Sequence, residues 1–144
     1  MAMGKKEIKI VWTGGVAGSG KLEGDYLKTE LAIPRSYKGS GEGSDPMELL
    51  VSAAATCYIA TLTSILENRK LPVEEVTMDS EIEASKEGMK ITHVPQITLS
   101  ADAAEEQRQA AEKAMELADK ACTVGNLLEK AGAEIDIRGL VLNR

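Results

Sequence analysis

The chain has 144 residues, a length typical of one domain, so we expect a single domain over residues 1–144. It carries 17 Lys and Arg against 23 Asp and Glu, and this acidic balance gives it no general attraction to nucleic acid or to anionic membranes. The first residues alternate charged and apolar side chains and lack the apolar run of a secretory signal. We therefore expect a cytosolic protein without nucleic-acid or membrane partners.

Alternating apolar residues predict two strands near the start, over residues 8–12 and 27–33. The glycine-rich segment 14–20 lies between them. It fits most of a phosphate-binding loop, but Leu22 stands where a hydroxyl would bind magnesium. A flexible connection with positive φ angles explains the same glycines, so we predict an opening hairpin and no nucleotide site.

A long helix is predicted next. Asp45 is suited to the N-cap, Pro46 to the first helical position, and Glu48 stands three residues after the cap. Residues 49–66 carry no charge, which reaches the lower limit for crossing a bilayer, but alanines and hydroxyl residues make up much of the segment. A helix that is apolar all round belongs in a core. A domain this small covers about one side of it, so we expect a homodimer to cover the other.

The second half of the chain is predicted to form two strands joined by a tight turn, then two helices and a last strand. The ranges are 76–82, 89–93, 102–121, 123–131 and 135–141. Asp102 with Glu105 resembles a capping box, and Gly132 stands where helices commonly end. The apolar stripe of the longer helix is Ala103, Gln107, Ala110, Ala114, Leu117 and Ala121. These ranges bring the total to about five predicted strands.

The two cysteines have unusual settings. Cys57 lies midway along the uncharged helix, and Cys122 ends a long charged helix. Free cysteines are usually small buried hydrophobes, which is one interpretation. In the cytosol, however, resting thiols are kept reduced, so a pair is more often catalytic or redox-sensing than a static crosslink.

A reactive Cys57 would need a nearby cation, because apolar surroundings disfavour the thiolate and the helix dipole acts mainly within the first turn. Arg35, at the end of the second predicted strand, is our candidate, and the alternative is a solvated surface arginine. His93 has no second ligand at a suitable spacing for zinc and is interpreted as a strand residue. Tyr58 is interpreted as a buried tyrosine with a satisfied hydroxyl.

Four segments carry a family resemblance when taken in order. They read DPMELL at 45–50, AAATC at 53–57, ACTVGNL at 121–127 and IDI at 135–137. In this order and spacing they resemble the OsmC/Ohr family of thiol peroxidases, over nearly the whole chain. The resemblance implies the α+β fold class, with antiparallel sheets packed around a long central helix, in an intertwined homodimer with two interfacial sites.

By the same resemblance, Cys57 attacks a peroxide, either an organic hydroperoxide or hydrogen peroxide, and becomes a sulfenic acid. Cys122 resolves it to a disulfide. Arg35 stabilises the thiolate, and an external dithiol, of the lipoyl type in some family members, regenerates the enzyme. No bound cofactor and no metal are implied.

The chain departs from the family pattern at two places. The family's active-site glutamate corresponds to Met47, with Glu48 one place later, so Glu48 either holds Arg35 or caps the helix. Thr123 replaces the usual proline after the second cysteine. The segment PMELL at 46–50 resembles a less characterised OsmC-like branch. The alternative function is therefore a non-catalytic, small-molecule-binding dimer in which the thiols merely pack.

Overall fold

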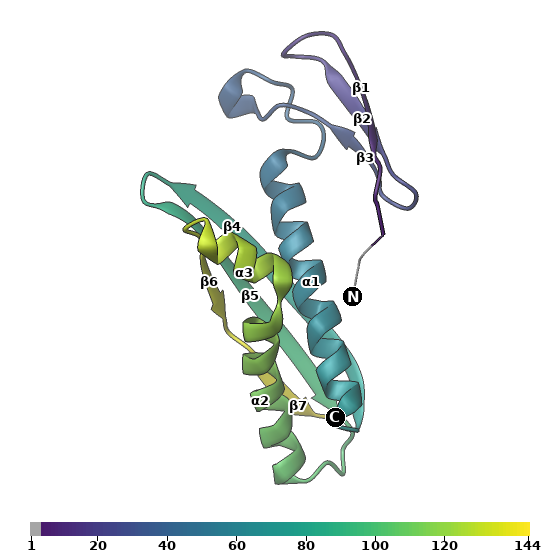
Figure 1. Ribbon diagram of the computed structural model, residues 1–144, viewed down its shortest axis with the longest axis vertical. Helices are drawn as coiled ribbons and strands as arrows, with labels where there is room; N and C mark the ends of the chain where they lie inside the picture. Colours follow the sequence, from purple (N-terminus) through teal and green to yellow (C-terminus); the bar gives the residue numbers. More distant parts are fainter. Residues whose placement is uncertain (1–3) are drawn as a thin grey trace. The chain divides into compact units, whose positions relative to one another are not determined.

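The expected α+β class is confirmed in the computed structural model, which describes residues 4–144. The described chain forms two units, one extending to Leu49 and the other spanning Leu50–Arg144 (Figure 1). The N-terminal unit is built on a small sheet. The C-terminal unit holds most of helix α1, two further helices and a second sheet.

The N-terminal sheet is an antiparallel meander rather than the predicted hairpin. Its strands are β1 (Lys9–Thr13), β2 (Ser19–Glu23) and β3 (Lys28–Leu31), in that order. The prediction was wrong because residues 19–23, which begin inside the glycine-rich segment 14–20, were assigned no strand. In β2, buried Gly20 and Leu22 alternate with exposed Lys21 and Glu23, which is the pattern of a strand with one covered face.

Helix α1 (Pro46–Asn68) starts as predicted, because the backbone N–H of Glu48 donates to Oδ1 of Asp45 at 2.9 Å. Its buried residues recur every four positions, at Ala54, Tyr58, Leu62 and Leu66. The helix is long and apolar enough to cross a bilayer, with a mean hydropathy of 1.8. Within the C-terminal unit, this buried stripe packs into the core as in a globular domain.

The second sheet is a long antiparallel hairpin extended by two short parallel strands. Strand β4 (Val73–Ser85) pairs with β5 (Gly88–Leu99), and β5 also pairs with β6 (Glu134–Ile137) and β7 (Leu140–Asn143). The predicted last strand is therefore two strands. The strand is interrupted near Arg138, whose backbone N–H donates to the carbonyl of His93 at 2.8 Å. With β2, this division gives seven described strands instead of about five.

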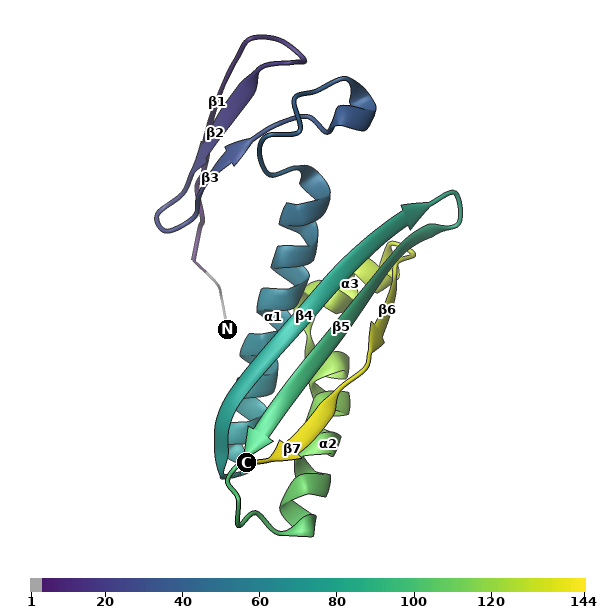
Figure 2. The same cartoon turned by 180° about the vertical axis from the view of Figure 1, so that it is seen from behind.

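Helices α2 (Glu105–Ala121) and α3 (Thr123–Lys130) follow the hairpin. In both views α1 and α2 lie side by side on one face of the β4–β5 hairpin (Figures 1 and 2). The predicted capping box was wrong. Asp102 instead accepts a hydrogen bond from Ser100, and α2 begins at Glu105, with the side chain of Gln107 bound to the Ala104 N–H.

The buried face of α2 is also rotated from the predicted stripe, and only Ala114 belongs to both. The buried residues are Ala111, Ala114, Met115 and Ala118. They meet the buried stripe of α1 and the inner face of β5 in one core. The short helix α3 was predicted well, since it ends at Lys130 and Gly132 has a φ of 100°.

Candidate active site

The structure brings the two cysteines together although they lie 65 positions apart in the sequence. Cys57 lies on α1 beside the buried stripe and is half-buried, whereas Cys122 joins α2 to α3 and is only 3% exposed. The Cys57 side chain lies close enough to Cys122 to contribute to the raised pKa of the Cys122 thiol, and neither cysteine is in a disulfide. The two sulfurs are thus close together, and only Cys57 is partly open to solvent.

The buried thiol of Cys122 has one neighbour that favours its charged form and others that disfavour it. Sγ of Cys122 accepts the backbone N–H of Gly125 at 3.4 Å, at the start of α3. Burial raises the pKa of Cys122 to about 11. The Gly125 N–H opposes this shift, while Cys57 and the charge of Asp119 reinforce it. Cys122 therefore keeps its proton at neutral pH.

Gly125 packs closely against the Cys122 thiol. A Cβ atom added there would lie 3.3 Å from Sγ of Cys122 and 3.3 Å from a methyl carbon of Ile135. A larger residue would press on the sulfur. Sequence analysis identified this glycine only as part of the family motif at 121–127.

Tyr58 and His93 form a buried polar group behind the thiols. The hydroxyl of Tyr58 donates to the carbonyl of Met115 at 2.9 Å, which confirms the expected buried tyrosine with a satisfied hydroxyl. Its ring stacks on His93 with centroids 5.3 Å apart, and Nδ1 of His93 lies 2.6 Å from Oγ of Ser80. Burial lowers the pKa of His93, and burial together with Asp119 and Cys122 raises that of Tyr58.

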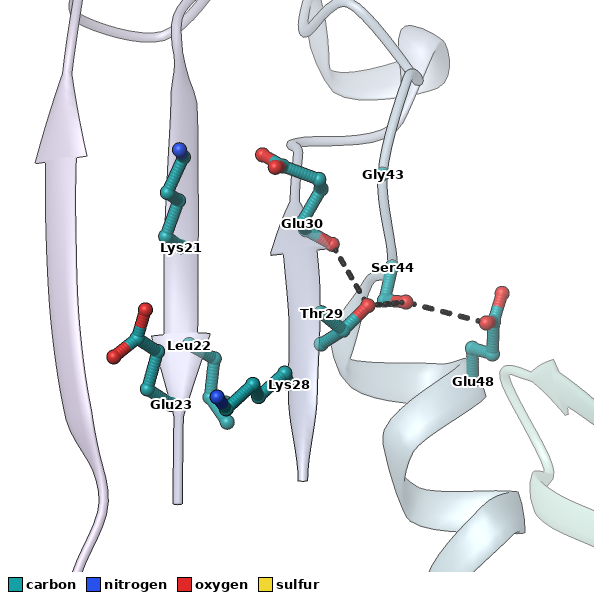
Figure 3. Close-up of a pocket in the computed structure, with 9 residues that line it drawn as sticks. All are labelled: Lys21, Leu22, Glu23, Lys28, Thr29, Glu30, Gly43, Ser44 and Glu48. Carbon is teal, nitrogen blue, oxygen red and sulfur yellow. Dashed lines mark hydrogen bonds between the residues drawn. The ribbon is translucent and has the colours of Figure 1, made fainter. Parts of the chain in front are cut away.

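The other two predicted site residues lie in the N-terminal unit. Arg35 begins the short 3₁₀ helix η1 (Arg35–Tyr37), is exposed, and donates from Nε to the carbonyl of Ser40 at 3.1 Å. Glu48 lies in the first turn of α1, where its carboxylate accepts a hydrogen bond from Oγ of Ser44 at 3.3 Å (Figure 3). These contacts favour a role for Glu48 at the helix start, and the catalytic role of Arg35 stays a prediction.

Two pockets indent the N-terminal unit. One, of about 610 Å³, is polar and includes Lys21, Glu23, Lys28 and Glu30 in its lining (Figure 3). The other, of about 510 Å³, is almost entirely apolar and includes Met47. Its lining residues are Ile10, Trp12, Leu22, Leu31, Ala32, Ile33, Pro34, Tyr37, Ser44, Asp45, Pro46, Met47 and Leu49. The second pocket has the size and character of a small-molecule site.

Comparisons with solved structures support the same architecture. An organic hydroperoxide resistance protein OsmC from Legionella pneumophila is 24% identical, with 99% of each chain covered and a TM-score of 0.67. An OsmC-like protein from Mycoplasma pneumoniae is 18% identical, with coverage of 96% and 98% and a TM-score of 0.74. For OhrB of Bacillus subtilis the identity is 17%, the coverage 92% and 97%, and the TM-score 0.59. At these identities the likeness shows the fold.

Sequence comparison identifies the family. The uncharacterized protein YmaD of Bacillus subtilis is 35% identical over 127 residues, which are 85% of each chain. Residues 39–138 match the family described as OsmC-like protein, and this segment contains both cysteines. The resemblance noted in the sequence is confirmed, and the chain belongs to the OsmC-like family.

Proposed function

We propose that this protein is a thiol peroxidase that reduces hydroperoxides through Cys57 and Cys122. The observation that carries the proposal is the unequal pair: a half-buried thiol in contact with a buried one that keeps its proton. An attacking thiol must be reached by substrate, whereas a resolving thiol needs only to reach the attacking one. The names of the hydroperoxide resistance proteins with this fold agree with that chemistry.

The reaction proceeds in three steps. The Cys57 thiolate attacks one peroxide oxygen, the O–O bond breaks, the alcohol leaves with a proton, and Cys57 becomes a sulfenic acid. Sγ of Cys122 then attacks the sulfur of Cys57, which releases water and forms the disulfide. An external dithiol reduces that disulfide by two thiol exchanges and is itself oxidised to a disulfide.

The N-terminal unit supplies the remaining parts in this proposal. Arg35 provides the cation that stabilises the Cys57 thiolate, because a guanidinium stays charged when desolvated. The same unit has an apolar pocket of about 510 Å³, and an organic hydroperoxide, unlike hydrogen peroxide, has an apolar group that such a pocket can bind.

A homodimer belongs to the same proposal. All five residues of β1 are exposed in the single chain, including Ile10, Val11 and Trp12. The face of α1 opposite its buried stripe is exposed at Ala53, Thr56 and Ala60. Exposed apolar residues of this kind are typical of an interface. A monomer found by light scattering at micromolar concentration would contradict the dimer.

The second candidate function, non-catalytic binding of an apolar small molecule, is favoured by the same apolar pocket. In that case the thiols only pack. The alternative predicts binding of a fluorescent fatty acid without peroxide consumption, and binding that Cys57→Ser leaves unchanged.

Peroxide consumption tests the two functions against each other. The reduced wild type is mixed in a stopped-flow instrument with cumene hydroperoxide or hydrogen peroxide, and loss of free thiol is followed. We expect two thiols lost per peroxide, faster with the organic peroxide, no reaction in Cys57→Ser, and a dimedone-reactive sulfenic acid at Cys57 in Cys122→Ser. Thiol loss equally slow in the wild type and Cys57→Ser would contradict the peroxidase function.

A further inference from the structure

A buried hydrogen bond joins α1, which carries Cys57, to α2, which ends next to Cys122. Tyr58 directly follows Cys57 on α1, its side chain is 1% exposed, and its hydroxyl donates to the carbonyl of Met115 on α2 at 2.9 Å. Met115 precedes Cys122 by seven residues, about two helical turns, so both lie on the same side of α2. The bond therefore links α1, next to Cys57, to the side of α2 that leads to Cys122.

The tyrosine ring is held from the sheet side as well. It stacks on the ring of His93 with an interplanar angle of 27°, and His93 is 2% exposed at the centre of β5. On the neighbouring strand, Oγ of Ser80 lies 2.6 Å from Nδ1 of His93. Ser80, His93 and Tyr58 thus form a continuous polar column from the β4–β5 hairpin to α2.

This column lies in a core that is mostly apolar. The cluster around it contains Leu62, Leu66, Ile97 and Leu99. Burying polar groups costs free energy unless each is hydrogen-bonded, and an apolar side chain of similar size would avoid that cost. A satisfied buried polar network, in exchange, fixes one arrangement of the elements that it joins.

We infer that Tyr58 is a positioning residue, held by His93 and Ser80, that fixes α1 against α2 so that Cys57 and Cys122 stay within reach of each other. The importance of this role for turnover rests on the function proposed above. The positioning itself is measurable without any peroxide. The quantity that it sets is the effective concentration of one thiol at the other.

Equilibration with glutathione measures that concentration. The dithiol protein and glutathione disulfide give the protein disulfide and two glutathione molecules, so the electrons balance. Wild type and Tyr58→Phe are equilibrated over a range of glutathione ratios, quenched with acid, and analysed by mass spectrometry. We expect the equilibrium constant for disulfide formation to fall about fivefold in Tyr58→Phe, the size of one ordinary hydrogen bond. Ser80→Ala should lower it less.

Two controls distinguish positioning of the two thiols from a general loss of core packing. Leu66→Val trims the same buried stripe two turns away from Tyr58 and should leave the constant within twofold of the wild type. In the Cys122→Ser background, adding Tyr58→Phe should leave the alkylation rate of Cys57 unchanged, because the tyrosine acts on the pair rather than on one thiol.

An unchanged constant in Tyr58→Phe would overturn the inference, as would an equal fall in Leu66→Val. A wild-type protein that forms no disulfide at any glutathione ratio would overturn it too. Failure of the proposed function has a different signature. It would appear as a wild type that forms the disulfide with glutathione, responds to Tyr58→Phe, and yet consumes no peroxide.

Discussion

The Cys57 thiol lies close enough to Cys122 to contribute to its raised pKa, yet only Cys57 has an appreciable opening to solvent. This asymmetry arises from their elements. Cys57 lies at the margin of the buried stripe of a long helix, and Cys122 lies in the tight link between two helices, beneath Gly125. Because the two thiols differ in exposure, we expect them to differ in reactivity.

Removal of the charge at Arg35 should slow the chemistry of Cys57. We expect Arg35→Ala to react with a thiol reagent about tenfold more slowly at pH 7, because an opposite charge nearby favours a thiolate. Arg35→Lys should keep much of the rate, and Arg69→Ala, at another exposed arginine, should change nothing. Stopped-flow alkylation measures all four proteins. Wild-type reactivity in Arg35→Ala would refute electrostatic activation by this residue.

Oxidation should raise the melting temperature. A disulfide between Cys57 and Cys122 closes a loop of about 65 residues, which the chain-entropy model values at about 4 kcal/mol. For a chain of this size that corresponds to a rise of roughly 10 °C. Calorimetry of the diamide-oxidised and the reduced protein measures the shift, and Cys57→Ser, which cannot form this disulfide, serves as control. Equal melting in oxidant and reductant would show that the sulfurs do not bridge.

Alkaline pH should destabilise the reduced protein through Cys122. Its folded pKa of about 11 lies above the ordinary thiol value of 9.0, so the folded state holds the proton more tightly than the unfolded state. The resulting stability is full below pH 9.0 and is lost as the pH rises towards about 11, on the order of 2 kcal/mol in total. Urea unfolding of the wild type and Cys122→Ser at several pH values isolates this loss. Parallel curves across that range would contradict the assignment.

Acid pH should destabilise the protein through its single histidine. Burial lowers the pKa of His93 below its ordinary 6.5, so the unfolded state binds the proton more readily. Stability is therefore full above pH 6.5 and declines as the pH falls from there towards the folded pKa. The groups facing the ring, Ser80 and Tyr58, are neutral in this range and add no charge. Between pH 6.5 and 5, the urea midpoint of the wild type should fall more steeply with decreasing pH than that of His93→Gln. The same pH dependence in both proteins would contradict the prediction.

The sequence by itself determined the features that depend on local chemistry. Asp45 and Pro46 start α1 where the capping signals place them. The turn at residues 86–87 separates the two predicted strands, although β4 and β5 extend beyond the predicted ranges 76–82 and 89–93. Family membership also followed from short segments around Cys57 and Cys122. Where local signals were ambiguous, the predictions failed. Strand β2 begins inside a glycine-rich segment and was not predicted. The N-cap of α2 is Ala104, two residues after the predicted Asp102.

Only the tertiary structure decided which distant residues meet. The contact of Cys57 with Cys122, the bond from Tyr58 to Met115 and the pairing of Ser80 with His93 all join elements far apart along the chain. Periodicity identifies a buried helix face but not the face that it meets, since rotating α2 by one residue changes every partner. The opposite exposures of the two thiols follow from the same packing, because burial depends on how neighbouring elements close over a side chain.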